Sequence, residues 1–137
     1  MAMNEHKVRQ LNPTFNRLRQ EYDASNVRLD YNELIDTLYI YVIPGQDPLV
    51  SVPQEDGLTA LMVNPVTEEV HGFQIDDYLH RAVSKSPHLL ELAPLAGIDQ
   101  EAVDSAREQI SVQRRREATI SASLSELLAG PVRSKRT

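Results

Sequence analysis

Two histidines and two aspartates in the middle of the chain are its best candidates for chemistry. Asp76 and Asp77 precede His80 by one helical turn, which places a carboxylate and an imidazole on one helix face, and His71 could join them from the preceding strand. Two imidazoles and a carboxylate could hold a divalent transition metal, or a carboxylate could orient a histidine as a general base. The sequence therefore offers His71, Asp76, Asp77 and His80 as candidate ligands of a metal-binding protein or a small metal-dependent enzyme.

The same residues also have a simpler interpretation. Acidic side chains are favoured in the first turn of a helix by the helix dipole, so Asp76 and Asp77 need no metal to explain them. The sequence contains no His-Glu-x-x-His pattern, no Gly-x-Ser-x-Gly elbow and no glycine-rich phosphate loop, and it has no cysteine to act as a thiol nucleophile. We therefore expect no catalytic residue, no resident metal and no cofactor, and we identify no small-molecule substrate.

The elements around these residues are predicted to be strands. Apolar runs and turn residues predict a half-buried strand or strand lead-in over 27–31 and four strands over 38–43, 49–52, 58–63 and 70–75. Both faces of the 38–43 strand are apolar or aromatic, which indicates a central strand, with Leu38, Ile40 and Val42 forming one wall of the core. Sequential strands with short turns predict an antiparallel β-meander of about four strands.

Helices are predicted on both sides of the strands. Helical spacing and start signals predict short helices over 13–22, from Asp76 onward and over 88–93. Asp99 is a good N-cap for a long helix over 99–129, and Gly130-Pro131 is its expected end. A capping-box pattern at Ser123 leaves open a break near Thr119.

The chain is expected to form one α+β domain. Its length suits a single hydrophobic core, so residues 1–130 form the predicted domain. The sheet core occupies about 27–85, the C-terminal helical segment 99–129, and a flexible basic tail 131–137.

Part of this core is similar to a known family. The informative residues are Tyr31 and Asp36, the triplet Leu38-Tyr39-Ile40, the Asp56-Gly57 turn, and Val70-x-Gly72-Phe73. In this order they resemble a small, mostly bacterial family described as domain of unknown function 2283. Asn32 replaces the usual aspartate of that family, and the interval between Asp56 and Gly72 is longer than typical. The resemblance, over 31–75, implies a compact β-meander followed by a helix and brings no activity, cofactor or catalytic residue.

Composition favours a cytoplasmic protein. The absence of cysteine fits a reducing compartment, and charged residues interrupt the N-terminus where a signal peptide needs an apolar run. No other apolar run approaches the length needed to cross a bilayer. We therefore expect no membrane association.

Charge disfavours nucleic acid as a partner. Residues 27–101 hold 13 acidic and 3 basic residues, which would repel phosphate backbones, and aromatic residues make up only 5% of the chain. The run Arg114-Arg115-Arg116 could contact phosphate, but three adjacent residues fan around a helix, so we expect one of them to face inward or to snorkel. Nucleic-acid binding through this Arg-rich C-terminal helix stays a lesser alternative.

The C-terminal helix predicts self-association. Unbroken over 99–129 it would extend roughly 45 Å, whereas a compact domain of this size measures roughly 33 Å across. The overhanging apolar stripe would need a partner, most simply a second chain about a two-fold axis, unless a break near Thr119 folds the distal turns back. The sequence therefore predicts a non-enzymatic structural or protein-interaction domain that forms a homo-oligomer, a dimer first of all, through Ile110, Ile120, Leu124, Leu127 and Leu128.

Overall fold

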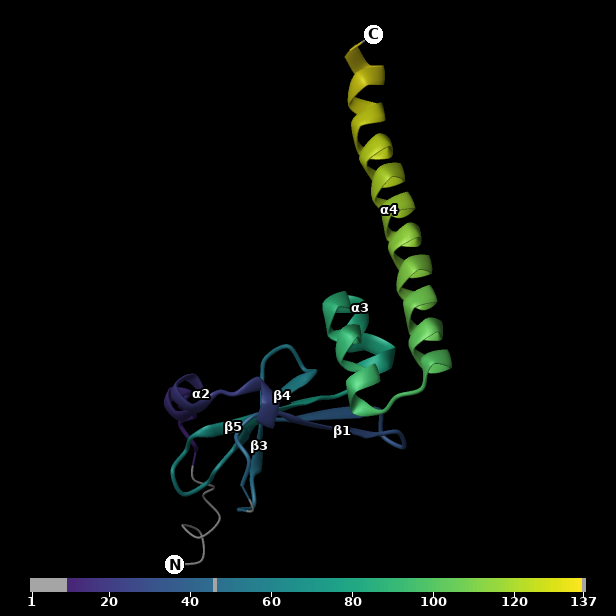
Figure 1. Cartoon of the computed structure of the whole chain (residues 1–137). Helices are drawn as coiled ribbons and strands as arrows, with labels where there is room; N and C mark the ends of the chain where they lie inside the picture. The colour runs from purple at the N-terminus through teal and green to yellow at the C-terminus, as the bar shows by residue number, and fades with distance from the viewer. Residues whose placement is uncertain (1–9, 46, 137) are drawn as a thin grey trace, which may run out of the picture.

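A five-stranded antiparallel sheet carries helices on one of its faces (Figure 1). The computed structural model describes residues 10–45 and 47–136, and in these ranges the side chains of Glu21 and 131–136 are outside the description. The strands are β1 (Arg28–Asn32), β2 (Thr37–Tyr41), β3 (Val50–Pro53), β4 (Thr59–Val63) and β5 (Val70–Ile75). The predicted α+β class is confirmed.

The strand order is β1-β2-β5-β4-β3, which corrects part of the predicted topology. β3, β4 and β5 form a meander as expected, but β2 pairs with β5 instead of with its successor β3. The connection from β2 to β3 is a long segment containing Pro44 and Pro48, so it is not a tight hairpin turn. Pro53 cannot donate to a ladder, and it is tolerated because β3 is an edge strand.

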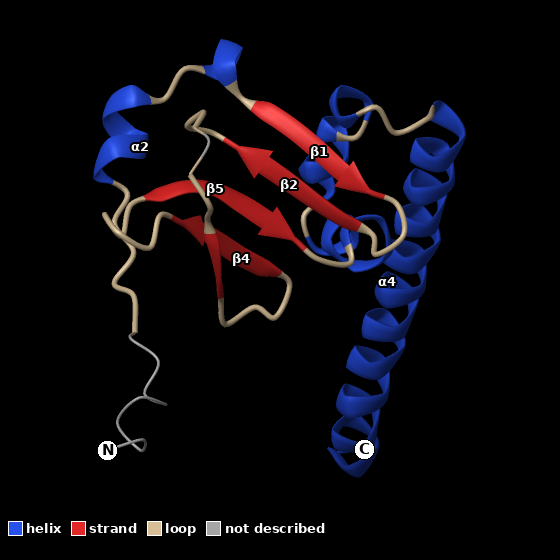
Figure 2. Ribbon diagram, turned by 90° about the horizontal axis from the view of Figure 1, so that it is seen from below, coloured by secondary structure: helices blue, strands red, loops and turns tan. Residues whose placement is uncertain are grey.

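The two faces of the sheet differ in what covers them. Leu38, Ile40 and Phe73 point to the face that carries the helices, which we call the core face. Arg28 and Tyr41 occupy the alternate strand positions and point to the opposite face, which we call the open face. Figures 1 and 2 show that the helices lie on the core-face side of the strands. The wall predicted from Leu38, Ile40 and Val42 is only partly right, because Leu38 and Val42 are buried while Ile40 is half-buried.

Two glycines are required by the strand geometry. Gly57 has φ 73° in the Asp56-Gly57 turn, where the Asp56 carboxylate accepts hydrogen bonds from the N–H groups of Leu58 and Thr59. At Gly72 a Cβ atom would collide with the carbonyl oxygen of Ile40 on the neighbouring strand, so only glycine lets β2 and β5 approach this closely.

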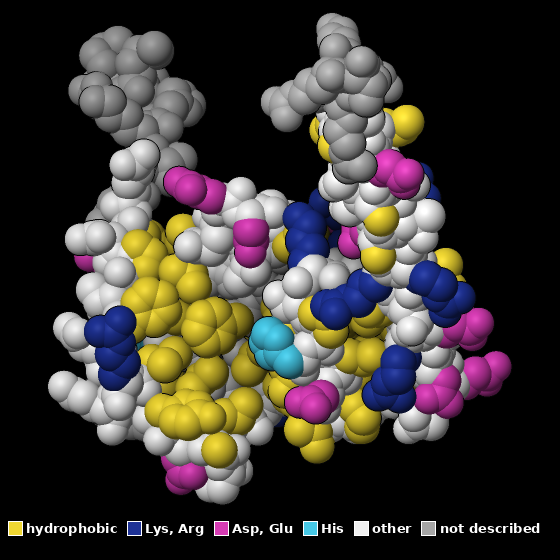
Figure 3. All heavy atoms as spheres, turned by 90° about the horizontal axis from the view of Figure 1, so that it is seen from above, with side chains coloured by type: hydrophobic (Ala, Val, Ile, Leu, Met, Phe, Trp, Pro, Cys, Tyr) yellow, Lys and Arg dark blue, Asp and Glu magenta, His cyan; other side chains and the backbone are white. Residues whose placement is uncertain are grey.

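Short helical turns connect the strands and close the core. They are α2 (Asn16–Glu21), η1 (Ala24–Asn26), the π-helix η2 (Tyr78–Ala82), α3 (Val83–Lys85), η3 (Pro87–Leu92) and η4 (Pro94–Ala96). The short helices predicted over 13–22, after Asp76 and over 88–93 correspond to α2, to η2 with α3, and to η3. Figure 3 shows that apolar side chains remain visible from the core-face side beside these helices.

The last helix, α4 (Gln100–Arg136), is continuous. Asp99 caps it as predicted, since its carboxylate accepts from the N–H of Ala102 at 2.8 Å. The possible break near Thr119 does not occur: α4 continues through this residue, and the Thr119 hydroxyl donates to the Arg115 carbonyl of the preceding turn. The predicted end at Gly130-Pro131 is also wrong: a proline removes one helical hydrogen bond, and the turns around it still form. The prediction that the tail 131–137 is flexible falls on residues whose side chains lie outside the described part of the structure.

Two apolar clusters fill the core face. The larger joins the sheet to the helices through Leu38, Ile75, Tyr78, Leu58, Ala82, Val83, Leu90, Ala93, Val103, Ala106 and Ile110. The smaller consists of Leu61, Val63 and Val70, with Leu11, Phe15, Leu18, Val52 and Phe73 packed against it. Only the first turns of α4 take part in these clusters.

Candidate functional site

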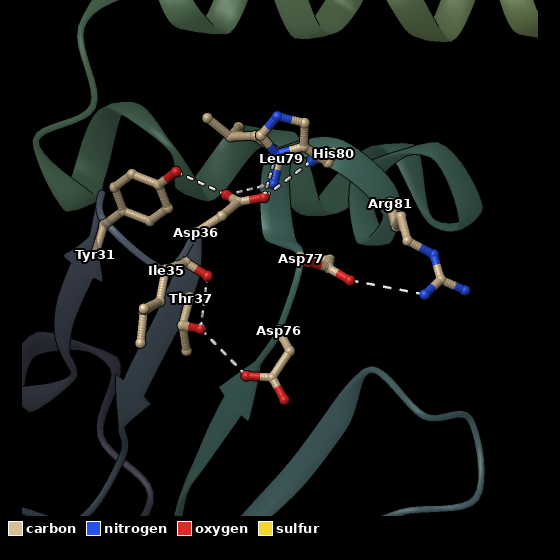
Figure 4. Close-up of polar contacts among 9 residues, drawn as sticks. All are labelled: Tyr31, Ile35, Asp36, Thr37, Asp76, Asp77, Leu79, His80 and Arg81. Atoms are coloured by element: carbon tan, nitrogen blue, oxygen red, sulfur yellow. Dashed lines mark hydrogen bonds and ion pairs between the residues drawn. The ribbon is translucent and has the colours of Figure 1, made fainter.

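Asp36 lies at the centre of a polar cluster that joins the β1–β2 turn to η2 (Figure 4). Its carboxylate accepts hydrogen bonds from the Tyr31 hydroxyl at 2.7 Å and from the N–H groups of Leu79 at 3.0 Å and His80 at 3.2 Å. Nδ1 of the His80 ring lies 2.6 Å from Oδ2 of Asp36. The Asp36 carbonyl also accepts from the N–H of Tyr78 at 2.9 Å.

The local backbone explains why Asp36 reaches η2. Asp36 has φ 51°, in the left-handed region that aspartate tolerates better than most residues. The first N–H groups of a helix have no partner within the helix, and Asp77 at the N-cap makes no capping hydrogen bond with its side chain. Asp36 supplies the missing acceptor from a different part of the chain. The cluster is therefore a long-range cap for η2.

Charge is balanced inside this cluster. Burial acts to raise the pKa of Asp36, but hydrogen bonds from Leu79, Tyr31 and His80 outweigh it and hold that pKa below its usual value. The hydrogen bond to Asp36 and the charge of Asp36 raise the pKa of His80. Burial, with the charge of Asp36, raises the pKa of Tyr78 to about 12. The arrangement favours an ionised Asp36 beside a protonated His80.

An aspartate that orients a histidine is also the arrangement of a general base. The His80 side chain is 76% exposed, so the rest of its ring faces solvent. Within the described part of the chain, Asp36 is the group that holds this ring, and no hydroxyl or amine is hydrogen-bonded to it. The pair therefore fastens η2 to the β1–β2 turn and activates no nucleophile of the described residues.

Asp76 and Asp77, the candidate metal ligands that follow β5, do not bind the ring of His80. Asp76 accepts hydrogen bonds from Thr37 Oγ1 at 3.2 Å and Gln74 Nε2 at 3.0 Å. Asp77 is exposed and pairs with Arg81 at 3.7 Å, one helical turn further on. Figure 4 shows both carboxylates directed away from the ring of His80. Among the described residues, no three His, Asp or Glu side chains are grouped so that they could hold a metal ion.

His71, the fourth candidate, lies near the opposite end of β5. Its side chain is buried, with 5% exposed, and its carbonyl accepts from the N–H groups of Val42 and Ile43. It lines a pocket of about 550 Å³ together with Arg28 and Tyr41 of the open face. Arg28 lies over the Tyr41 ring, 4.5 Å from its centre. His71 thus takes part in a different surface from His80.

Sequence reasoning missed Asp36 as the partner of His80. The two residues are 44 positions apart, so no helical or strand spacing links them. The one available signal was the place of Tyr31 and Asp36 in the family resemblance, which says nothing about their contacts.

The residues predicted for self-association fall into two groups along α4. Ile110 is only 8% exposed and belongs to the main core, so its assignment to an interface with a second chain is corrected. Beyond it, residues 111–128 are all exposed. The apolar residues of this distal stripe have exposed fractions of 41% for Ile120, 52% for Leu124, 66% for Leu127 and 76% for Leu128.

The basic run of α4 is also fully on the surface. Arg114, Arg115 and Arg116 are all exposed, so of the two expected alternatives the one in which an arginine faces inward is wrong. The reason is that α4 has already left the core at this point, and its nearest neighbour, α3, lies across an open hollow that Arg114 lines with Ser84 and Lys85.

Comparison with known proteins adds no relative. No family model matches the chain, and neither a curated protein nor a solved structure matches it. Membership of the family that residues 31–75 resemble stays a prediction. In the part of the chain that the structure describes, no helix combines the length and the apolar character needed to cross a membrane.

Proposed function

We propose that this protein is a non-enzymatic protein-interaction domain that pairs with a second copy of itself through the distal half of α4, residues 111–130. The supporting observation is the distal stripe of Ile120, Leu124, Leu127 and Leu128, which is exposed along a helix that projects from the body (Figure 1). Large apolar side chains in a continuous stripe mark an interaction surface more often than a solvated one.

Helix stability supports the same proposal. An isolated helix is marginally stable in water, and most helices in proteins are held by packing of an apolar face. The 37 residues of α4 extend about 55 Å at 1.5 Å per residue, and only its first turns pack on the body. A partner along the distal stripe would supply the missing packing and remove the leucines from water.

The polar interruption of the stripe fits its position. Gln113 and Glu117 occupy the same helix face as the apolar residues and are 3.5 Å apart through a side-chain hydrogen bond. They line an open hollow of about 650 Å³ with Ser84 and Lys85 at α3. The face is therefore polar where α4 passes α3 and apolar again from Ile120 onward, where a second chain could reach it.

The test compares two glutamate substitutions in the distal half of α4. Leu124→Glu places a charge in the stripe, whereas Ala122→Glu places the same charge about 200° around the helix. We expect the wild type and Ala122→Glu to sediment as dimers and Leu124→Glu to sediment as a monomer, with circular dichroism showing that the sheet core is kept. A monomeric wild type, or a dimer unaffected by Leu124→Glu, contradicts the proposed function.

A further inference from the structure

One part of the core face carries apolar side chains that the described residues cover only in part. Over β3, β4 and β5, the described residues that pack on the smaller cluster from outside the sheet are Leu11, Phe15 and Leu18, and Val50, Val52 and Phe73 remain at least partly exposed. Figure 3, which views this side of the molecule, shows a continuous area of apolar side chains there. We call this surface, made of Phe15, Val50, Val52 and Phe73 above the buried Leu61, the apolar floor.

The distal stripe of α4 faces the same side of the molecule. Val103, Ala106 and Ile110 contact the core at alternating intervals of three and four residues, and Ile120, Leu124 and Leu127 continue that series along one helix face. The stripe therefore looks toward the side on which the sheet lies, but beyond the end of the body. Within one chain, the distal half of α4 projects away from the sheet, so the stripe does not reach the floor of its own chain (Figure 1).

We infer that the distal stripe of each α4 docks on the apolar floor of a second copy of this chain. The inference rests on the proposed function and specifies its geometry. A two-fold axis beside α4 inverts the second copy, so its α4 runs antiparallel to the first and its distal half comes over the first chain's floor. The contact is then made twice, and both apolar surfaces of both chains are buried.

Charge favours this arrangement over pairing of two α4 helices alone. Arg114, Arg115 and Arg116 flank or back the stripe, and all three are exposed. A parallel pair of α4 helices in register places the two arginine runs at the same level, where like charges repel. Docking on the floor instead brings them toward the sheet region, residues 27–101, where 13 acids face 3 bases.

The absence of cysteine makes a direct test simple. Val50 on the floor and Leu127 in the stripe are 38% and 66% exposed, so single replacements, Val50→Cys and Leu127→Cys, leave the core intact. The two variants are mixed, allowed to exchange subunits and treated with a short bismaleimide. Ile35→Cys, 56% exposed in the β1–β2 turn and away from the floor, replaces Val50→Cys in the control mixture.

We expect a cross-link between chains in the Val50→Cys and Leu127→Cys mixture, identified by mass spectrometry, and none in the control mixture. We also expect Val50→Glu to raise the dimer dissociation constant at least about tenfold, because this site is buried twice per dimer, and Ile35→Glu to change it less than about twofold. A dimer that cross-links only between two Leu127→Cys chains, or that gives no floor cross-link, contradicts the inference and leaves the proposed function standing. A monomeric protein contradicts both.

Discussion

Asp36 shows how one buried carboxylate can organise two distant segments. It sits in a turn at φ 51° and satisfies N–H groups at the start of η2, so the β1–β2 turn and η2 hold each other in place. A buried charge is costly unless it is hydrogen-bonded, and here the Tyr31 hydroxyl and the His80 ring complete the set. The carboxylate is therefore a structural element of the described fold.

The first prediction concerns this carboxylate. Asp36→Asn keeps the shape and tolerates the left-handed backbone, but it removes the charge and presents an amide to donors that need acceptors. We expect it to lower the free energy of unfolding by about 1–3 kcal/mol. Asp77→Asn is the matched control, because Asp77 is also left-handed at φ 47° but is an exposed partner of Arg81. It should change stability by less than about 0.5 kcal/mol. Equal effects in urea titrations would show that Asp36 does not act as a cap.

The second prediction concerns the pH dependence of the Asp36–His80 pair. The raised pKa of His80 stabilises the fold fully below its unfolded pKa of about 6.5, and this contribution is lost as pH rises through the folded pKa. The lowered pKa of Asp36 stabilises above about pH 4 and is lost as pH falls through the folded pKa. Both contributions are therefore present between roughly pH 4 and 6.5.

Unfolding free energies of wild type and His80→Gln measure this effect. We expect the difference between them to be larger at pH 5.5 than at pH 9. His88→Gln, at an exposed histidine of η3, is measured in parallel as the control substitution. A difference for His80→Gln that is the same at both pH values would show that the ion pair does not form in solution.

At this scale the sequence indicates residue types better than partners. Asp76, Asp77 and His80 share a local spacing, yet each bonds elsewhere, to Thr37, Arg81 and Asp36. Local spacing determines which residues share a helix face, whereas hydrogen bonds between distant residues depend on the turn geometry that brings them together. That geometry includes the left-handed Asp36, which no spacing rule predicts.

Among the elements, α4 combines two roles in one continuous helix. Its first turns contribute Val103, Ala106 and Ile110 to the core, so they belong to the domain. Its distal half makes no such contribution, and its apolar residues are exposed. A single stripe thus passes from the inside of the protein to its surface.

The third prediction separates these roles. Ile110→Ala removes buried apolar volume and should lower the free energy of unfolding by about 2 kcal/mol at any protein concentration. Ile120→Ala, from an exposed position, should lower stability only where the chains are associated, so its effect should shrink as the protein is diluted. Thermal unfolding over a hundredfold range of concentration distinguishes them. An Ile120→Ala effect independent of concentration would place this residue in an intramolecular contact.

The elements themselves were largely predictable from local pattern. The predicted strands and short helices occur near their expected positions, because hydrophobic period and turn residues are local signals, whereas the short turns η1 and η4 were not predicted. The pairing of β2 with β5 was not predicted, since it depends on a long connection and on the close approach that Gly72 permits. The continuity of α4 through Thr119 was likewise undecided, because a capping pattern and a helical pattern coincide at Ser123.

For the whole molecule, the central feature is the contrast between an enclosed core and the exposed distal half of α4. The polar cluster at Asp36 satisfies its own partners, and the large apolar cluster is enclosed by helices. The distal stripe of α4 and the apolar floor are the apolar surfaces that these contacts leave incomplete. Association of two chains would bury both surfaces. The length of the predicted C-terminal helix already indicated such association, and the apolar floor specifies where the helix would dock.

Sedimentation equilibrium of the unmodified chain over a wide range of concentration tests this account most directly. One chain has a mass of 15.5 kDa. We predict a mass of two chains at micromolar concentration that falls toward one chain on dilution, as mass action requires for a reversible dimer. A mass of 15.5 kDa at every concentration would contradict the account.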